Sequence, residues 1–211
     1  MKKSLLLLGV IAALAIGVPA YSQAIWFDVD GNGVCNSLDV LTSSTTAVDV
    51  WLDTNHNAAG TLVTCVDPTA VLDITSYDLV IHKGTSGSVA YSAITPWTNS
   101  LTGFTQQPNT NFTVAGNDAG LTYSSAGYLA EGKYKLGTLN VTVTGTPVLT
   151  FLDLSPDPSL PSFGTGFGSH CPGSGPPYTI SLGPDFTDAC GTASTTLTES
   201  TTWGKIKQLY R

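Results

Sequence analysis

The segment YKLGTLNVTV, from Tyr134 to Val143, shows the pattern that decides the fold class. Its apolar residues Leu139, Val141 and Val143 alternate with polar ones. An alternation with a period of two places apolar side chains on one face of a β-strand and polar side chains on the other. A Gly- and Pro-containing turn follows at residues 144–147, so the chain is expected to return as a second strand over residues 148–154.

Other segments of the chain carry the same kind of signal. In residues 76–82, Tyr77, Leu79 and Ile81 fall on one face. Further strands are expected at residues 48–53, 88–94, 112–115, 120–124 and 178–182. About eight to ten short strands separated by turns predict an all-β protein with an antiparallel β-sandwich. Residues 155–177, rich in Gly, Pro and Ser, are expected to form an irregular surface loop.

The composition supports a β-protein and excludes two other classes. The chain has 15 acidic and 8 basic residues, a net charge of −7, and its acids are thirteen Asp against two Glu. Helical bundles use Glu, Lys and Arg freely on their exposed faces, and this chain does not. The acidic balance excludes a nucleic-acid partner, because binding to phosphates needs a basic surface.

The N-terminus has the layout of a signal peptide. Lys2 and Lys3 precede an apolar run over residues 5–18, and small residues end at Ala24. We therefore expect a signal peptide at residues 1–24, a secreted or cell-surface protein, and no membrane span in the mature chain; cleavage after Ala20 and an uncleaved anchor are the alternatives. The rest divides into a calcium-binding segment (25–46), a sandwich domain (47–193) and a Ser/Thr linker with a basic tail (194–211).

The four cysteines are an even number, and in an exported protein an even number suggests two disulfides. We favour the pairs Cys35–Cys65 and Cys171–Cys190 because they close the shortest loops, although the sequence does not prove the connectivity. A redox or catalytic thiol is disfavoured, since no C-x-x-C spacing occurs.

The most specific motif is a twelve-residue run of oxygen-bearing side chains that begins at Asp28. Oxygen ligands fall at positions one, three, five, nine and twelve, the sixth position is Gly33, and the seventh offers a backbone carbonyl. Ca²⁺ takes six to eight oxygen ligands at flexible angles, which this spacing supplies from one loop. The predicted ligands are Asp28, Asp30, Asn32, Val34, Asn36 and Asp39.

This run, D-x-D-x-N-G-x-x-N-S-x-D, resembles the calcium loop of dockerin modules, including Asn36-Ser37 before Asp39. The resemblance implies the same ligand positions. A dockerin has two such loops, each followed by a helix, whereas residues 42–46 here are a poor helix sequence. Docking into a cohesin is therefore not implied. Because Cys35 lies inside the loop, a disulfide would fix the loop to the body, and we interpret the calcium as structural.

A second acid–amide cluster, Asp53, Asn55 and Asn57, repeats the first three ligand positions. Its sixth position is alanine rather than glycine. It is either a degenerate second calcium site or a plain hairpin turn, because Asn and Asp also favour turns.

The order of the strands is similar to that of cohesin-type modules. The similarity lies in residues 76–82, 112–123 and 132–151. It implies a non-catalytic jelly-roll sandwich that binds partner proteins, with relatives that bind carbohydrate. No binding residue is assigned to this chain from the similarity.

Catalytic motifs are missing from the sequence. There is no G-x-S-x-G elbow, no H-E-x-x-H pair, no phosphate loop and no dinucleotide fingerprint. The two Glu, Glu131 and Glu199, lie in weakly patterned segments. Asp78 and Asp153 are not excluded as catalytic carboxylates. The sequence therefore predicts a protein that is not an enzyme.

Two functions remain. The first is a calcium-stabilised module for protein–protein interaction, adhesion or extracellular structural assembly. The second is a carbohydrate-binding module, in which Trp51 and Trp97 would stack on sugar rings. Trp51 should point away from its apolar neighbours on the strand, either toward such a ligand or under a loop. The partner is thus a protein or a polysaccharide outside the cell.

Overall fold

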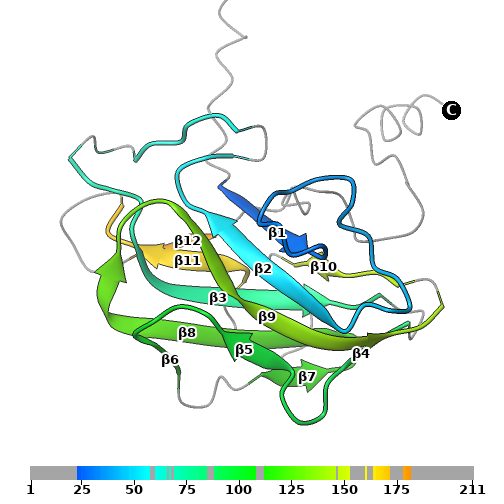
Figure 1. Cartoon of the computed structure of the whole chain (residues 1–211). Helices are drawn as coiled ribbons and strands as arrows, with labels where there is room; N and C mark the ends of the chain where they lie inside the picture. Colours follow the sequence, from blue (N-terminus) through cyan, green and yellow to red (C-terminus); the bar gives the residue numbers. More distant parts are fainter. Residues whose placement is uncertain are drawn as a thin grey trace, which may run out of the picture.

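The computed structural model describes residues 23–57, 60–65, 67, 69–84, 88–107, 112–145, 147–152, 160, 164–171 and 178–181. These residues form twelve strands in two sheets that face each other, and no helix (Figure 1). Every pairing between the strands is antiparallel. The predicted all-β sandwich is confirmed. Within the described part of the chain, no helix has the length and hydropathy needed to cross a membrane.

The first sheet has the strand order β1-β2-β9-β4, and β5 also pairs with β9. Its members are β1 (Ala24–Asp28), β2 (Ala47–Asp53), β4 (Val89–Tyr91), β5 (Trp97–Asn99) and β9 (Lys133–Val143).

The second sheet has the order β12-β11-β3-β8-β6, while β10 pairs with β3 and β7 pairs with β8. Its members are β3 (Ile74–His82), β6 (Phe104–Gln106), β7 (Thr113–Ala115), β8 (Asp118–Leu129), β10 (Thr150–Phe151), β11 (Gly166–Ser169) and β12 (Tyr178–Ser181).

The apolar positions of the long strands form the core between the sheets. The alternating residues expected to point inward are buried in β9 and β3, as are those of β2. Phe27 of β1 stacks on Phe151 of β10 with the ring centroids 4.0 Å apart, which joins the two sheets. Burial of this apolar surface is the main favourable contribution to folding.

Gly137 allows the ring of Trp97 to lie close against the middle of β9. A Cβ atom at this position would come within 2.3 Å of the Trp97 ring and 2.6 Å of the Thr98 carbonyl oxygen. The register of β2 on β9 also shifts here, between Val50 and Trp51. A glycine inside a strand commonly marks such a bulge or close approach.

Four strands were not expected from the sequence: β1, β5, β6 and β11. The prediction that residues 155–177 have no regular structure is wrong at β11, which lies beside β3 and is fully buried. Glycine has low β-propensity, so this segment gave no strand signal. The structure requires glycine because a Cβ atom at Gly168 would lie 2.4 Å from the Ser76 hydroxyl.

The predicted disulfide pairs are also wrong. Cys65 bonds to Cys171, with 5.6 Å between the Cα atoms and 106 residues between them in sequence. Cys35 is also in a disulfide, whose partner is therefore neither of these two; Cys190 lies outside the described residues. The shortest-loop rule failed because pairing follows proximity in the fold, which brings the segment after β2 next to the end of β11.

We expect the Cys65→Ser/Cys171→Ser double variant to lose about 2–5 kcal/mol of unfolding free energy, because this disulfide closes a loop of more than 100 residues in the unfolded chain. Urea unfolding under oxidising conditions measures the loss. After full reduction, the wild type and the double variant should unfold at nearly the same urea concentration. A peptide map that joins Cys35 to Cys65 would contradict the assignment.

Candidate metal centre

The candidate metal centre is the loop that follows β1. Asp28 is the last residue of this strand, and the chain is irregular from residue 29 until β2 begins at Ala47 (Figure 1). The predicted ligands therefore lie on one short segment at the end of an edge strand.

Three carboxylates converge in this loop. Asp28, Asp30 and Asp39 each offer one oxygen, and these oxygens all lie within 4.8 Å of one another. Asp28 and Asp39 are buried, at 1% and 5% exposure, whereas Asp30 is exposed. The structure thus brings together three of the residues that the sequence singles out as calcium ligands.

Backbone N–H groups hold the two buried carboxylates in place. Asp28 accepts hydrogen bonds from the backbone nitrogens of Gly31 and Gly33, each at 2.8 Å. Asp39 accepts from Val29 at 2.8 Å and from Asn36 at 2.9 Å. Since these bonds join the beginning and the end of the loop, its shape is fixed by its own side chains. The turn passes through a positive φ of 73° at Gly33, which suits glycine.

The other three predicted ligands hydrogen bond within the loop. Asn32 donates through Nδ2 to Asp30 at 2.8 Å and accepts from the backbone nitrogen of Val34 at 2.6 Å. Asn36 donates through Nδ2 to the Val34 carbonyl oxygen at 2.9 Å. All six predicted residues thus share one loop, and the three acids among them form a convergent cluster.

The electrostatics of the loop favour a bound cation. Burial raises the pKa of Asp28, and the nearby charge of Asp39 raises it further. Within the described part of the chain, no ion pair involves either of these buried acids. Lys133 approaches the loop, but its Nζ donates to the Gly33 carbonyl oxygen at 3.0 Å. A divalent cation among oxygen ligands would offset the repulsion between the two carboxylates.

Trp51 of β2 supports the loop from the sheet. Its Nε1 donates to the Asp28 carboxylate at 3.0 Å, and its ring lies only 3.1 Å from where a Cβ atom on Gly33 would be. The ring stacks on Trp26, and the Lys133 ammonium lies 5.6 Å from its centroid. Sequence reasoning missed this supporting role, although the position of Trp51 opposite the buried residues of β2 was correctly predicted.

Neither tryptophan proposed for sugar stacking is presented as an open aromatic surface. Trp97 is only 7% exposed and packs against Tyr77, with 6.5 Å between the ring centroids. Trp51 is half-buried and engaged with the loop, as described above. The positions of these two rings do not favour the carbohydrate-binding alternative.

The second acid–amide cluster has a different set of partners. Asp53 accepts from the backbone nitrogens of Asn55 and His56, and both its oxygens lie 3.2 Å from Nδ1 of His56. Asn57 accepts from the backbone nitrogen of Thr61 at 2.9 Å. Hydrogen bonds of this kind are typical of a closed turn, and a second calcium site at this cluster stays a prediction.

Each of the three histidines contacts an aspartate through Nδ1. Besides the pair at residues 53 and 56, His82 lies 2.6 Å from Asp118, and His170 lies 2.5 Å from Asp73. Burial opposes ionisation of Asp73, but hydrogen bonds from His170 and Ser169 outweigh it and lower the pKa of the carboxyl. The pairs of His82 with Asp118 and of His170 with Asp73 join residues far apart in the sequence, so the sequence gave no sign of them. The three pairs give all three histidines a structural role.

The four carboxylates that were considered as catalytic candidates lie in different parts of the chain. Asp78 is buried in β3, where the Thr122 hydroxyl donates to it at 2.6 Å, and burial raises its pKa to about 6. Glu131 is exposed in the turn between β8 and β9. Asp153 and Glu199 lie outside the described residues.

No protein-family model matches this chain, and no curated protein sequence matches it. Among solved structures, the chain is similar to a cohesin module from Clostridium perfringens ATCC13124 family 33 glycoside hydrolase. The match has a TM-score of 0.42 and 11% sequence identity, and it covers 76% of this chain and 91% of that module.

Replacing Asp78 with Asn should stabilise the protein at neutral pH and leave its stability below pH 4 nearly unchanged. The folded state keeps the Asp78 proton up to about pH 6, whereas the unfolded state loses it near pH 3.8. Wild-type stability therefore falls by up to about 3 kcal/mol as the pH rises through this window, and the variant lacks that fall. Urea unfolding at pH 4, 5, 6 and 7 measures the difference.

Thr122→Val is the matched control, because loss of the hydroxyl that favours the carboxylate should move the window to higher pH. A difference between wild type and Asp78→Asn that is the same at every pH would show that the carboxyl does not titrate in this window.

Proposed function

We propose that the protein is a secreted, non-catalytic interaction module whose fold is stabilised by Ca²⁺ bound in the loop from Asp28 to Asp39. The observation that carries the proposal is the convergence of Asp28, Asp30 and Asp39 in a loop already closed by backbone hydrogen bonds. Pre-organised ligands lose little conformational freedom when the ion binds.

The donor set fits calcium better than a softer metal. The loop offers carboxylate, amide and carbonyl oxygens, which are the ligands of hard cations, while zinc and copper favour imidazole and thiolate. Cys35 lies in the loop but is in a disulfide, so it has no thiolate to give. The loop also contains the oxygens that could complete the coordination, those of Asn32, Asn36 and the Val34 carbonyl. Each of these residues already hydrogen bonds within the loop.

The attachments of the loop support a structural role for the ion rather than a switch. Asp28 belongs to β1, which pairs along its full length with β2. Trp51 holds the same carboxylate from β2, and the disulfide at Cys35 adds a covalent tie. A loop that is fixed at three points has few alternative conformations to switch between.

Two further observations support export and a binding role. The disulfide between Cys65 and Cys171 suits an oxidising compartment, in line with the signal-peptide layout of the N-terminus. Each histidine is paired with an aspartate, and Asp78 is enclosed in the sheet, so these titratable groups serve the fold. Adhesion or extracellular assembly through a protein partner is the role that we infer.

Calcium should raise the melting temperature of the purified protein by several degrees over that in EDTA. A micromolar site in millimolar calcium stabilises the folded state by about 4 kcal/mol. Asp30→Ala should abolish the difference, because it removes the exposed carboxylate of the cluster without emptying a buried position. Scanning calorimetry with and without calcium provides the measurement.

Asp67→Ala is the control, since Asp67 is an acid in a turn of its own and accepts from Thr69. It should keep the full response to calcium. Equal melting temperatures in calcium and EDTA would refute the calcium site and leave residues 28–39 as a turn held by hydrogen bonds.

A further inference from the structure

One side of the sandwich is built from a segment without charge. No charged residue or histidine occurs between Lys83 and Asp118, although the chain as a whole carries a net charge of −7. This segment contains β4 and β5, which pair with β9 in the first sheet, and β6 and β7, which pair with β8 in the second. Figure 1 shows these four strands on one side of the molecule. We call this side the uncharged edge.

An uncharged edge is unusual for a soluble β-sandwich. Proteins commonly protect the outer strands of their sheets with charges, above all lysine, because an open edge can pair with another chain. The neighbouring strand β9 adds no charge beyond its first three residues, since no charged residue occurs between Lys135 and Asp153. The cores of protein interfaces are depleted of charge in the same way.

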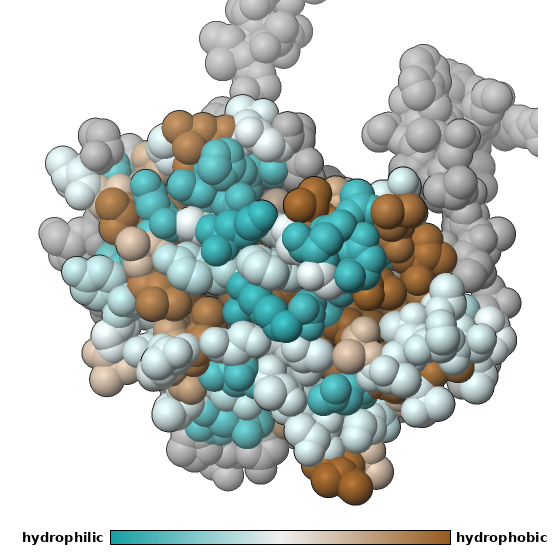
Figure 2. All heavy atoms as spheres, in the orientation of Figure 1, coloured by the Kyte–Doolittle hydropathy of each residue, from teal (hydrophilic) through white to brown (hydrophobic). Residues whose placement is uncertain are grey.

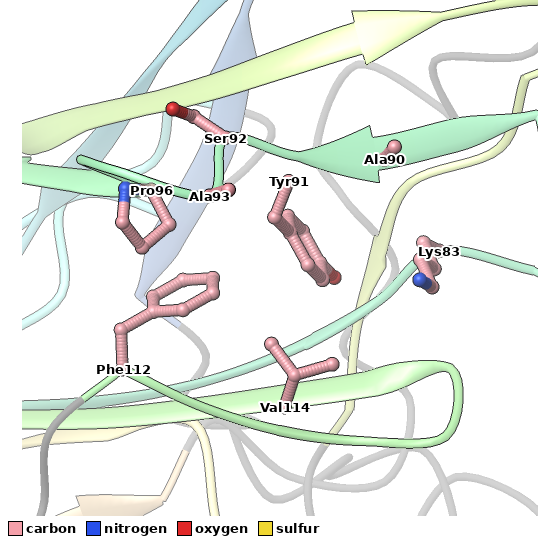
Figure 3. Close-up of a pocket in the computed structure, with 8 residues that line it drawn as sticks. All are labelled: Lys83, Ala90, Tyr91, Ser92, Ala93, Pro96, Phe112 and Val114. Atoms are coloured by element: carbon pink, nitrogen blue, oxygen red, sulfur yellow. The ribbon is translucent and has the colours of Figure 1, made fainter.

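The uncharged edge contains a pocket between β4 and β7, lined mostly by apolar and aromatic residues, with Lys83 and Ser92 also in its lining (Figure 3). Its volume is about 360 Å³, large enough for an aliphatic side chain. Tyr91 and Phe112 form two of its walls, edge to face with their centroids 5.1 Å apart, and Val114 lies below them. Lys83 closes one end, with its Nζ 5.2 Å from the Tyr91 ring centroid.

The loop beside this pocket presents a large apolar side chain to solvent. Ile94, between β4 and β5, is 93% exposed, and its neighbours Ala93 and Pro96 line the pocket. Hydrogen bonds between Asn140 of β9 and the two ends of the loop, at Ser92 and Pro96, hold it in place. In Figure 2 an apolar protrusion lies where Figure 1 places this loop.

We propose that two copies of the chain pair through the uncharged edge about a twofold axis, with Ile94 of each copy in the pocket of the other. A twofold contact brings one surface against itself, so that surface must be self-complementary. An apolar side chain beside an apolar pocket meets this requirement. The lack of charge in residues 84–117 meets it too, because a charged patch would face its own sign across the axis, and Lys83 lies only at one end of the pocket.

A second copy fits this surface better than an unrelated partner, because both halves of the contact lie on the same surface of one chain. Elsewhere the acidic surface would repel another copy. This proposal rests on the proposed function because it assigns a second copy of the chain as the partner of the interaction module. It does not require the calcium site.

Sedimentation equilibrium of the purified protein over a wide concentration range tests the pairing. We expect a reversible monomer–dimer equilibrium, weakened about tenfold to hundredfold by Ile94→Lys, which removes a buried aliphatic side chain and places a cation near Lys83 of the other copy. Leu62→Lys is the matched control, because Leu62 is also exposed, at 62%, but lies outside the uncharged edge. It should leave the equilibrium unchanged.

A mixing experiment tests the contact itself. Val114→Asp places an acid at the rim of the pocket, where Val114 is 48% exposed, and should also weaken the dimer. When the Ile94→Lys and Val114→Asp proteins are mixed, one contact of the heterodimer is wild type and the other pairs a lysine with an aspartate. The mixture should therefore dimerise more tightly than either variant does alone.

A wild type that stays monomeric at every concentration or an Ile94→Lys variant that dimerises as the wild type does would overturn the proposal. So would a mixture that dimerises no more tightly than the separate variants. A monomeric wild type that still melts higher in calcium would overturn the pairing alone. Equal melting temperatures in calcium and EDTA would count against the proposed function instead.

Discussion

The Asp28 carboxylate is the constraint on which the N-terminal part of the structure depends. It is buried at the end of β1 and accepts hydrogen bonds from the backbone of its own loop and from Trp51 of β2. Since β1 pairs with β2, a single side chain fixes the loop, the edge strand and the next strand relative to one another. Removing these donors would leave a buried carboxylate without partners, at a cost of several kcal/mol. Removing the carboxylate would leave the donors without their acceptor. The sheet thus holds the loop in one shape whether or not a cation completes it.

The sequence predicted those parts of the fold that depend on local patterning. Strands β2, β3 and β9 could be predicted with their inward faces because the alternation of their side chains is long and regular. Strands β5 and β6 are three residues long, too short for a period to show, and β11 is half glycine. The disulfide could not be predicted for a different reason. The proximity of Cys65 and Cys171 arises only when β11 lies beside β3, and sequence distance carries no information about that.

The same division applies to the candidate site. A tight loop brings its own residues together, and three acids that the sequence singled out, Asp28, Asp30 and Asp39, lie close together in it; their role as calcium ligands stays a prediction. Trp51 and Lys133 reach the loop from β2 and β9, and their approach depends on the pairing register of those strands, which includes a shift beside Trp51. Tertiary contacts of this kind explain why a motif predicted the cluster but not the residues that support it.

The distribution of charge gives the two edges of the first sheet different characters. At one edge, β1 leads into the loop that contains the three carboxylates. At the other edge, β4 and β5 carry no charge, and the loop between them interrupts the edge and presents Ile94 to solvent. An interruption of this kind blocks continuous strand pairing, so contact at this edge must come from side chains rather than from backbone hydrogen bonds. Side-chain contact into a defined pocket favours a closed pair over an open-ended stack of strands, because each pocket accepts one side chain and is then filled.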